Sequence, residues 1–220
     1  MPGVRISLPS GTPAELATPT TRAPSLGVVL CPDVMGLRPL FDDLCARMAE
    51  EQGWAVCAVE PFAGREELSL EQRLDAPLSD GLLDDLLAAA DATGAERTAV
   101  LGFCMGGLVA FLAAGLGRFD RAVAFYGMIR PPERWSGLGR PLDALAEPEA
   151  SDTLAITTGK DRWAPTDDVE ALRALDGVEV VVYPEADHGF VHDASRPTHR
   201  PDDAADAWRR VVSFLSGSGG

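Results

Sequence analysis

The 220-residue sequence has few basic residues. Its 19 lysines and arginines, of which Lys160 is the single lysine, stand against 34 aspartates and glutamates, giving a formal net charge of -15. Because nucleic-acid binding needs Lys and Arg to neutralise phosphates, this balance argues against such a partner. The sequence also lacks an apolar run of the roughly 18 residues that a membrane span needs, and its start lacks a signal-peptide profile. We expect a cytoplasmic protein that acts on a small molecule and binds neither nucleic acid nor a membrane.

Metal-binding patterns are also absent from the sequence. Its four cysteines form no C-x-x-C pair, and its three histidines, at positions 188, 192 and 199, have a spacing that fits no common ligand motif. Cys31 and Cys57 lie in strand-like runs and Cys45 lies in a helical pattern, so we expect these three to be small buried hydrophobes. We therefore predict no metal and no cofactor.

The apolar residues gather in seven short runs that are typical of β-strands. The middle runs are continuous instead of alternating, as in strands that a parallel sheet buries on both faces. The seven runs are residues 4–8, 26–31, 54–60, 98–103, 121–127, 153–159 and 178–184. Helical patterns separate most of them, at residues 37–53, 79–94, 106–117, 164–177 and 201–215. This alternation predicts an α/β fold, a mostly parallel sheet with helices on both faces.

Two segments lie outside the alternation of strands and helices. Residues 9–25 are expected to form a surface loop or hairpin, and the proline-containing segment 130–151 is expected to pass over the sheet edge. Because no internal repeat or linker interrupts the pattern, we predict that residues 1–220 form one domain.

The stretch LGFCMGG, residues 101–107, has the form of a nucleophile elbow with cysteine in the place of serine. Gly102 and Gly106 would let the strand and the following helix pass closely, and the helix N-terminus would favour the Cys104 thiolate. The N–H of Met105 would then face a developing oxyanion. A tight turn that simply buries Cys104 is the alternative interpretation.

Candidate partners for Cys104 follow later strands, in the order nucleophile, acid, histidine. Asp161 follows the run 153–159, and His188 follows the run 178–184. Catalytic groups collect at the carboxyl ends of strands in open α/β sheets. Asp161 is therefore predicted to orient His188, whereas Asp187 is a weaker candidate because its neighbouring side chain would point away.

The loop CPDVMGLRP, after the run 26–31, supplies two further candidates. The N–H of Val34 is the expected second oxyanion donor. Asp33 closes a buried strand and should face the same cleft. There it could hold the thiol protonated, contact substrate, or only form an Asx-turn or helix cap.

Taken together, these stretches resemble the dienelactone hydrolase family of the α/β-hydrolases. The resemblance runs from VVLCPDVMG through EPFAGR, LGFCMGG, FYG, GKDRWAP and YPEADHGF to AWRRVVSFL. It implies a Cys-Asp-His triad, an acidic residue that contacts the resting thiol, and two backbone oxyanion donors; these fall on Cys104, Asp161, His188, Asp33, Val34 and Met105. Asp33 is shorter than the family's usual Glu. Tyr126 of the FYG motif is a further candidate for substrate contact.

The resemblance also implies a chemistry that needs no cofactor. The thiolate attacks an ester or lactone carbonyl, the alkoxide leaves, and water assisted by His188 releases the acid from a covalent acyl-enzyme. The chain is then expected to be a monomer or a homodimer. Two alternatives stay open: a thioesterase or other acyl hydrolase with the same triad, and a non-catalytic binding protein on a hydrolase scaffold.

One position departs from the family's pattern. Members that cleave dienelactone have an arginine four residues after the catalytic histidine, where this sequence has His192. Arg73 is the candidate for a second carboxylate-binding arginine. His192 is predicted either to serve specificity or to lie on a surface loop, the latter being the plainer expectation. The loss of one carboxylate clamp puts dienelactone itself in doubt as a substrate.

Overall fold

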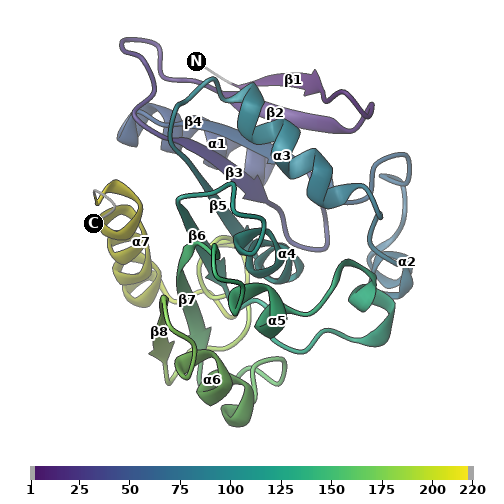
Figure 1. Cartoon of the computed structure of the whole chain (residues 1–220), viewed down its shortest axis with the longest axis vertical. Helices are drawn as coiled ribbons and strands as arrows, with labels where there is room; N and C mark the ends of the chain where they lie inside the picture. Colours follow the sequence, from purple (N-terminus) through teal and green to yellow (C-terminus); the bar gives the residue numbers. More distant parts are fainter. Residues whose placement is uncertain (1–2, 218–220) are drawn as a thin grey trace.

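The structure is a computed structural model and describes residues 3–217 (Figure 1). Its centre is an eight-stranded sheet with the order β1-β2-β4-β3-β5-β6-β7-β8. The strands are β1 (Val4–Ser7), β2 (Pro13–Ala17), β3 (Gly27–Cys31), β4 (Ala55–Val59), β5 (Thr98–Phe103), β6 (Arg121–Phe125), β7 (Asp152–Thr158) and β8 (Val178–Tyr183). The six strands from β4 to β8 in this order are parallel, whereas β1 and β2 pair antiparallel. The predicted α/β-hydrolase architecture, a mostly parallel sheet, is confirmed.

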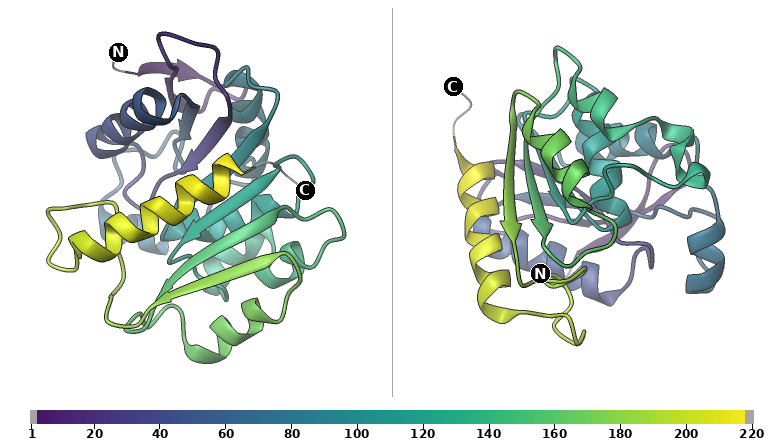
Figure 2. Two further views of the ribbon diagram at one scale, coloured as in Figure 1. Left: turned by 90° about the vertical axis from the view of Figure 1, so that its left-hand side faces the viewer. Right: turned by 90° about the horizontal axis from the view of Figure 1, so that it is seen from below.

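Strands β3, β4 and β5 are buried at every residue. Their continuous apolar sequences are explained by helices on both faces of the sheet. The helices α1 (Pro39–Gln52) and α7 (Pro201–Ser216) cover one face, and α3 (Leu82–Ala92), α4 (Met105–Ala114), α5 (Pro141–Leu145) and α6 (Thr166–Arg173) cover the other (Figure 2). Cys31, Cys45 and Cys57 are buried in this core, as expected.

Residues 9–25 contain the second strand of a hairpin with β1, one of the two forms expected for this segment, and β2 also pairs with β4. Two local features differ from the sequence pattern. A short helix, α2 (Leu70–Asp75), begins at a capping box made by Ser69 and Gln72. The segment 130–151 forms the 3-10 helix η1 (Glu133–Leu138) and then α5, which packs against α4.

The expected path of segment 130–151 over the sheet edge is therefore wrong. Its apolar side chains explain the difference, because Trp135 and Leu145 are buried in the layer on the α4 side of the sheet. The indole N–H of Trp135 also donates to the Ala76 carbonyl at 2.9 Å, which ties the segment to the chain after α2.

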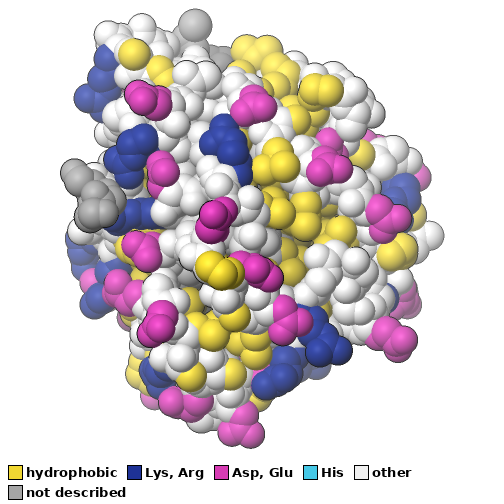
Figure 3. All heavy atoms as spheres, in the orientation of Figure 1, with side chains coloured by type: hydrophobic (Ala, Val, Ile, Leu, Met, Phe, Trp, Pro, Cys, Tyr) yellow, Lys and Arg dark blue, Asp and Glu magenta, His cyan; other side chains and the backbone are white. Residues whose placement is uncertain are grey.

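Acidic and basic side chains are interspersed on the face seen in Figure 3. Within residues 3–217, no helix is both long enough and apolar enough to cross a membrane. The parallel strands place their carboxyl ends along one edge of the sheet, and the loops that follow β3, β5, β7 and β8 carry the predicted site residues.

Candidate active site

Cys104 occupies a sharp turn between β5 and α4. Its φ of +59° lies in the left-handed region that non-glycine residues seldom adopt. Backbone contacts hold this conformation: a Cβ added to Gly102 would lie 1.9 Å from the Gly106 oxygen, and one added to Gly106 would lie 2.0 Å from the Cys31 oxygen. The strand and the helix thus approach so closely that only glycine fits. Strain of this kind at one residue is typical of functional positions.

The structure brings His188 between Asp161 and Cys104. Nδ1 of His188 donates to Oδ2 of Asp161 at 2.5 Å, and the Cys104 side chain hydrogen-bonds the same imidazole. The Asp161 side chain is fully buried, whereas 19% of the His188 side chain is exposed. Asp161 is itself held, because its Oδ1 accepts the N–H of Trp163 at 2.8 Å. Asp187 accepts the backbone N–H of His188 instead of contacting its ring.

The pKa of His188 reports the balance of these contacts. Burial alone lowers this pKa, but the hydrogen bonds to Asp161 and Cys104 outweigh burial and raise it from 6.5 to about 10. The imidazole is therefore protonated at neutral pH when sulfur carries negative charge beside it. It can donate that proton to a leaving group and accept another from water.

The two expected oxyanion donors lie on neighbouring backbone segments. Met105 begins α4, and a Cβ added to the next residue, Gly106, would touch the Cys31 and Pro32 carbonyl oxygens, so the helix start abuts the loop that carries Val34. Within residues 3–217, the backbone N–H groups of Val34 and Met105 donate to no acceptor. Two unpaired donors, one at the start of α4 and one on the adjoining loop, are suited to a developing negative charge.

Asp33 is enclosed by other polar groups. Its carboxylate receives the Met35 N–H at 2.9 Å, two hydrogen bonds from Arg38 at 2.7 and 2.8 Å, and Nε2–H of His192 at 2.8 Å. The hydrogen bond from the Met35 N–H makes Asp33 the first residue of an Asx-turn, which was one of its three expected roles. Although burial alone raises the pKa of Asp33, His192 and Arg38 lower it well below its usual range. The structure gives Asp33 no contact with the Cys104 thiol.

His192 does not lie on a surface loop. Its side chain is fully buried between the rings of Phe103, at a centroid distance of 4.8 Å, and Phe41, at 5.8 Å. Burial lowers the pKa of His192 and raises that of Tyr126, so both groups are neutral. The neutral Tyr126 hydroxyl donates to Nδ1 of His192 at 2.5 Å, which leaves Nε2–H for Asp33. Tyr126, His192, Asp33 and Arg38 are thus joined by hydrogen bonds in one series, which we call the buried polar chain.

Tyr126 links this buried polar chain to the triad. It directly follows β6 with a φ of +41°, and its ring centroid lies 5.1 Å from that of His188 in an edge-on arrangement. Sequence reasoning singled out Tyr126 only through its motif. It missed Arg38, because one arginine among 18 carries no distinguishing signal.

Arg73 is buried away from the triad in an internal ion pair. Its guanidinium lies 3.5 Å from Glu60 and donates to the carbonyls of Leu68 and Glu66. It also lies 5.0 Å from the Phe62 ring centroid. Glu60 in turn accepts the N–H groups of Leu37 and Phe62. Arg73 therefore supports the loops after β3 and β4, and none of its hydrogen-bond or ion-pair partners among residues 3–217 belongs to the triad.

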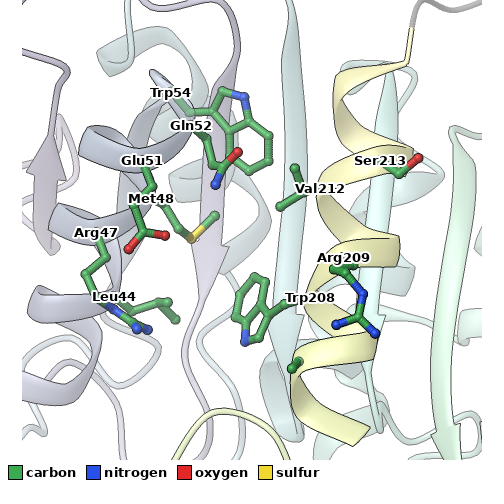
Figure 4. Close-up of a pocket in the computed structure, with 11 residues that line it drawn as sticks. Leu44, Arg47, Met48, Glu51, Gln52, Trp54, Trp208, Arg209, Val212 and Ser213 are labelled. Carbon is green, nitrogen blue, oxygen red and sulfur yellow. The ribbon is translucent and has the colours of Figure 1, made fainter. Parts of the chain in front are cut away.

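Two grooves of the molecule differ in their relation to the triad. A groove of about 550 Å³ between α1 and α7 is lined by Trp54, Met48 and Trp208 (Figure 4), but it contains no triad residue. A second groove of about 540 Å³ is lined by Asp161 and His188 themselves. The second groove therefore adjoins the aspartate and the histidine of the candidate triad. No group of His, Cys, Asp or Glu side chains in the described part of the chain is arranged to hold a metal ion.

Comparison with known proteins identifies the family of the chain. The sequence profile of the dienelactone hydrolase family matches residues 12–218. A Salmonella typhi protein provisionally named carboxymethylenebutenolidase is 31% identical over 228 residues, which cover 94% of this chain and 83% of that protein. Carboxymethylenebutenolidase 2 of Cupriavidus pinatubonensis is 30% identical over 187 residues, which cover 80% of this chain and 77% of that protein.

A similar solved structure comes from Klebsiella pneumoniae subsp. pneumoniae and is provisionally named a dienelactone hydrolase. It superposes with a TM-score of 0.81 at 26% identity and covers 98% of both chains. The family match thus extends over nearly all of the described residues and includes every strand of the sheet except β1. The chain belongs to the dienelactone hydrolase family and is a hydrolase that acts on carboxylic ester or lactone bonds.

Proposed function

We propose that the protein hydrolyses esters or lactones with Cys104 as a covalent nucleophile. The observation that carries this proposal is the hydrogen-bonded series Cys104, His188 and Asp161, in which the nucleophile lies on a strained turn at the end of β5. A structural cysteine would need neither the strained backbone nor a buried histidine–carboxylate pair beside it.

Acylation begins with attack of the Cys104 thiolate on the carbonyl carbon. The carbonyl π electrons move to oxygen, and the N–H groups of Val34 and Met105 stabilise that oxyanion. When the tetrahedral intermediate collapses, the carbon–oxygen bond to the leaving group breaks, and protonated His188 gives its proton to the departing alkoxide. The product is a thioester on Cys104 and an alcohol, or a ring-opened hydroxyl group when the substrate is a lactone.

Deacylation uses the same groups in the opposite sense. Neutral His188 takes a proton from water as the water oxygen attacks the thioester carbon. Collapse of the second intermediate expels the Cys104 thiolate and releases the acid. Asp161 keeps Nδ1 of His188 protonated throughout, so the other ring nitrogen always faces the reacting atoms.

Stopped-flow kinetics with p-nitrophenyl acetate test the covalent step. We expect a p-nitrophenolate burst equal to the enzyme concentration, and a mass increase of one acetyl group on Cys104 after acid quenching. Cys104→Ala should show neither, and Cys57→Ala is the matched control because Cys57 is buried in the sheet. Equal turnover by Cys104→Ala and the parent would overturn the cysteine mechanism.

We also propose that the protein acts in the cytoplasm. Its four cysteines are all free in the structure, and proteins of oxidising compartments commonly carry disulfides instead. Thiol titration of freshly extracted protein tests this, since four reactive thiols after denaturation are expected. Disulfides in native material would contradict it.

A further inference from the structure

Two strained backbone positions adjoin His188. Within residues 3–217, the non-glycine residues with a positive φ are Cys104, at +59°, and Tyr126, at +41°. Cys104 hydrogen-bonds the His188 imidazole, and Tyr126 packs edge-on against it. A positive φ is costly for a bulky side chain, and such positions cluster at functional sites. The role of the nucleophile accounts for the strain at Cys104, whereas no step of the proposed reaction uses Tyr126.

The backbone of Tyr126 is fixed on two sides. Its N–H donates to the Ile156 carbonyl of β7 at 2.7 Å. The next residue, Gly127, abuts α4, because a Cβ added to Gly127 would lie 2.6 Å from the Gly107 carbonyl carbon. The side chain of Tyr126 therefore leaves the end of β6 in one fixed direction, and only 1% of the residue is exposed.

The loop that carries His188 is packed around the Tyr126 side chain. The Tyr126 ring centroid lies 5.9 Å from the centroids of both Phe190 and His192. Its hydroxyl contacts the backbone N–H groups of Val191 and His192. The residues 188–192 thus take their position from one side chain of β6's carboxyl end.

The Tyr126 hydroxyl has no hydrogen bond left to offer a substrate. A phenolic hydroxyl has one donor and two acceptor sites. The donor is used by Nδ1 of His192 at 2.5 Å, and the acceptor side faces the N–H groups of Val191 and His192. Tyr126 therefore contributes the position of its ring, instead of a contact with the reacting atoms.

The support that His188 needs changes during the reaction. Asp161 holds Nδ1 of His188 throughout, but Cys104 holds the other side of the imidazole only while its sulfur is free. In the acyl-enzyme that sulfur is part of a thioester and is no longer a thiolate. Because the ring torsion of a histidine is broad, an imidazole bound at one nitrogen can still turn. The Tyr126 ring packed against His188 limits this turning, and deacylation needs that limit most.

We propose that Tyr126 and His192 are positioning residues: their hydrogen bond holds the Tyr126 ring against His188, so that the imidazole stays aligned to activate water at the acyl-enzyme. This inference rests on the proposed function and deepens it, because it assigns one chemical step to a buried histidine. Among residues 3–217, His192 makes no hydrogen bond or ring contact with Cys104, Asp161 or His188, so it acts through Tyr126.

The test compares Tyr126→Phe, His192→Leu and His192→Asn with the parent on p-nitrophenyl acetate. Asparagine has the shape of leucine but restores an acceptor near the place of Nδ1. All rates are divided by the burst amplitude, so protein that fails to fold is not counted. In Tyr126→Phe and His192→Leu, kcat should fall about tenfold, whereas kcat/KM, which reports acylation, should change less than about threefold. His192→Asn should return kcat to within about threefold of the parent.

Tyr183→Phe is the matched control, because it removes the chain's other tyrosine hydroxyl, which donates to Asp206 at 2.7 Å. Its kcat per active site should equal that of the parent. The proposal is overturned if Tyr126→Phe behaves like Tyr183→Phe, if kcat and kcat/KM fall together, or if His192→Asn is no better than His192→Leu. Failure of the proposed function looks different, namely a parent without a burst or turnover that survives in Cys104→Ala.

Discussion

Replacing His192 by phenylalanine probes the buried polar chain that joins Tyr126 to Asp33. The substitution keeps a ring of similar size between Phe103 and Phe41 but removes both ring nitrogens. The Tyr126 hydroxyl then loses its acceptor at 2.5 Å, and Asp33 loses one donor at 2.8 Å. Asp33 keeps its contacts with Arg38 and the Met35 N–H, so it stays partly satisfied.

The expected cost follows from these two losses. An orphaned buried hydroxyl hydrogen costs about 1–2 kcal/mol, and a hydrogen bond lost by a charged group costs about 1.5 kcal/mol, so His192→Phe should destabilise by about 3 kcal/mol. Tyr126→Phe should cost about 1.5 kcal/mol, because it leaves Nδ1 of His192 without a donor. The double variant should cost less than the sum by about 3 kcal/mol, since neither orphaned atom then remains and only the hydrogen bond lost by Asp33 is left.

Urea unfolding of the parent, both single variants and the double variant at pH 7.5 measures this coupling. The Tyr126 hydroxyl also contacts the backbone N–H groups of Val191 and His192. Tyr126→Phe removes these contacts whether residue 192 is histidine or phenylalanine, so their energy cancels from the coupling between the two substitutions. Additivity within about 0.5 kcal/mol would refute the inference that Tyr126 and His192 share one hydrogen bond.

Three further predictions concern other parts of the site. The pKa of His188 in the folded state, about 10, exceeds its usual value of 6.5. The contribution of His188 to the unfolding free energy is therefore complete below about pH 6.5 and is lost as the pH rises toward 10. The difference in unfolding free energy between the parent and His188→Gln should shrink over that range. Gly106→Ala would place a methyl group 2.0 Å from the Cys31 oxygen, and thermal unfolding should reveal a loss of stability of at least about 3 kcal/mol. A Tm equal to that of the parent would show that the turn can relax. Arg73→Met leaves the Glu60 side chain, which is 98% buried, without its cation, and urea unfolding should show a loss of stability of about 3 kcal/mol. A loss below about 1 kcal/mol would mean that the backbone N–H groups of Leu37 and Phe62 alone satisfy Glu60.

The positions of seven strands and most helices along the chain could be predicted, because burial of the middle strands on both faces leaves continuous apolar runs with helical patterns between them. Strand β2, with the sequence PAELA, carries no such signature; it is a strand because β1 and β4 pair with it on either side. Helix α2 is only six residues long, too short for a helical period to show in the sequence. Segment 130–151 was misplaced because its contacts with α4 connect residues far apart in the chain.

The candidate triad could be predicted for a topological reason. In a parallel sheet the loops after successive strands meet at one edge, so chain order and strand ends sufficed to group Cys104, Asp161 and His188. The burial of His192 could not be predicted in the same way. It depends on aromatic rings from β5 and α1 and on the short reach of Asp33, and none of these is a local property of the sequence.

The glycine contacts around Cys104 also bear on how the substrate specificity of this enzyme could evolve. Main-chain atoms of β5, α4 and the loop after β3 hold the sulfur in place, so its position is largely insulated from side-chain replacement elsewhere. Loops that carry no triad residue can therefore diversify without rebuilding the reactive centre. A laboratory library confined to those loops should keep a high fraction of chemically competent members, whereas one that includes Gly102 and Gly106 should not.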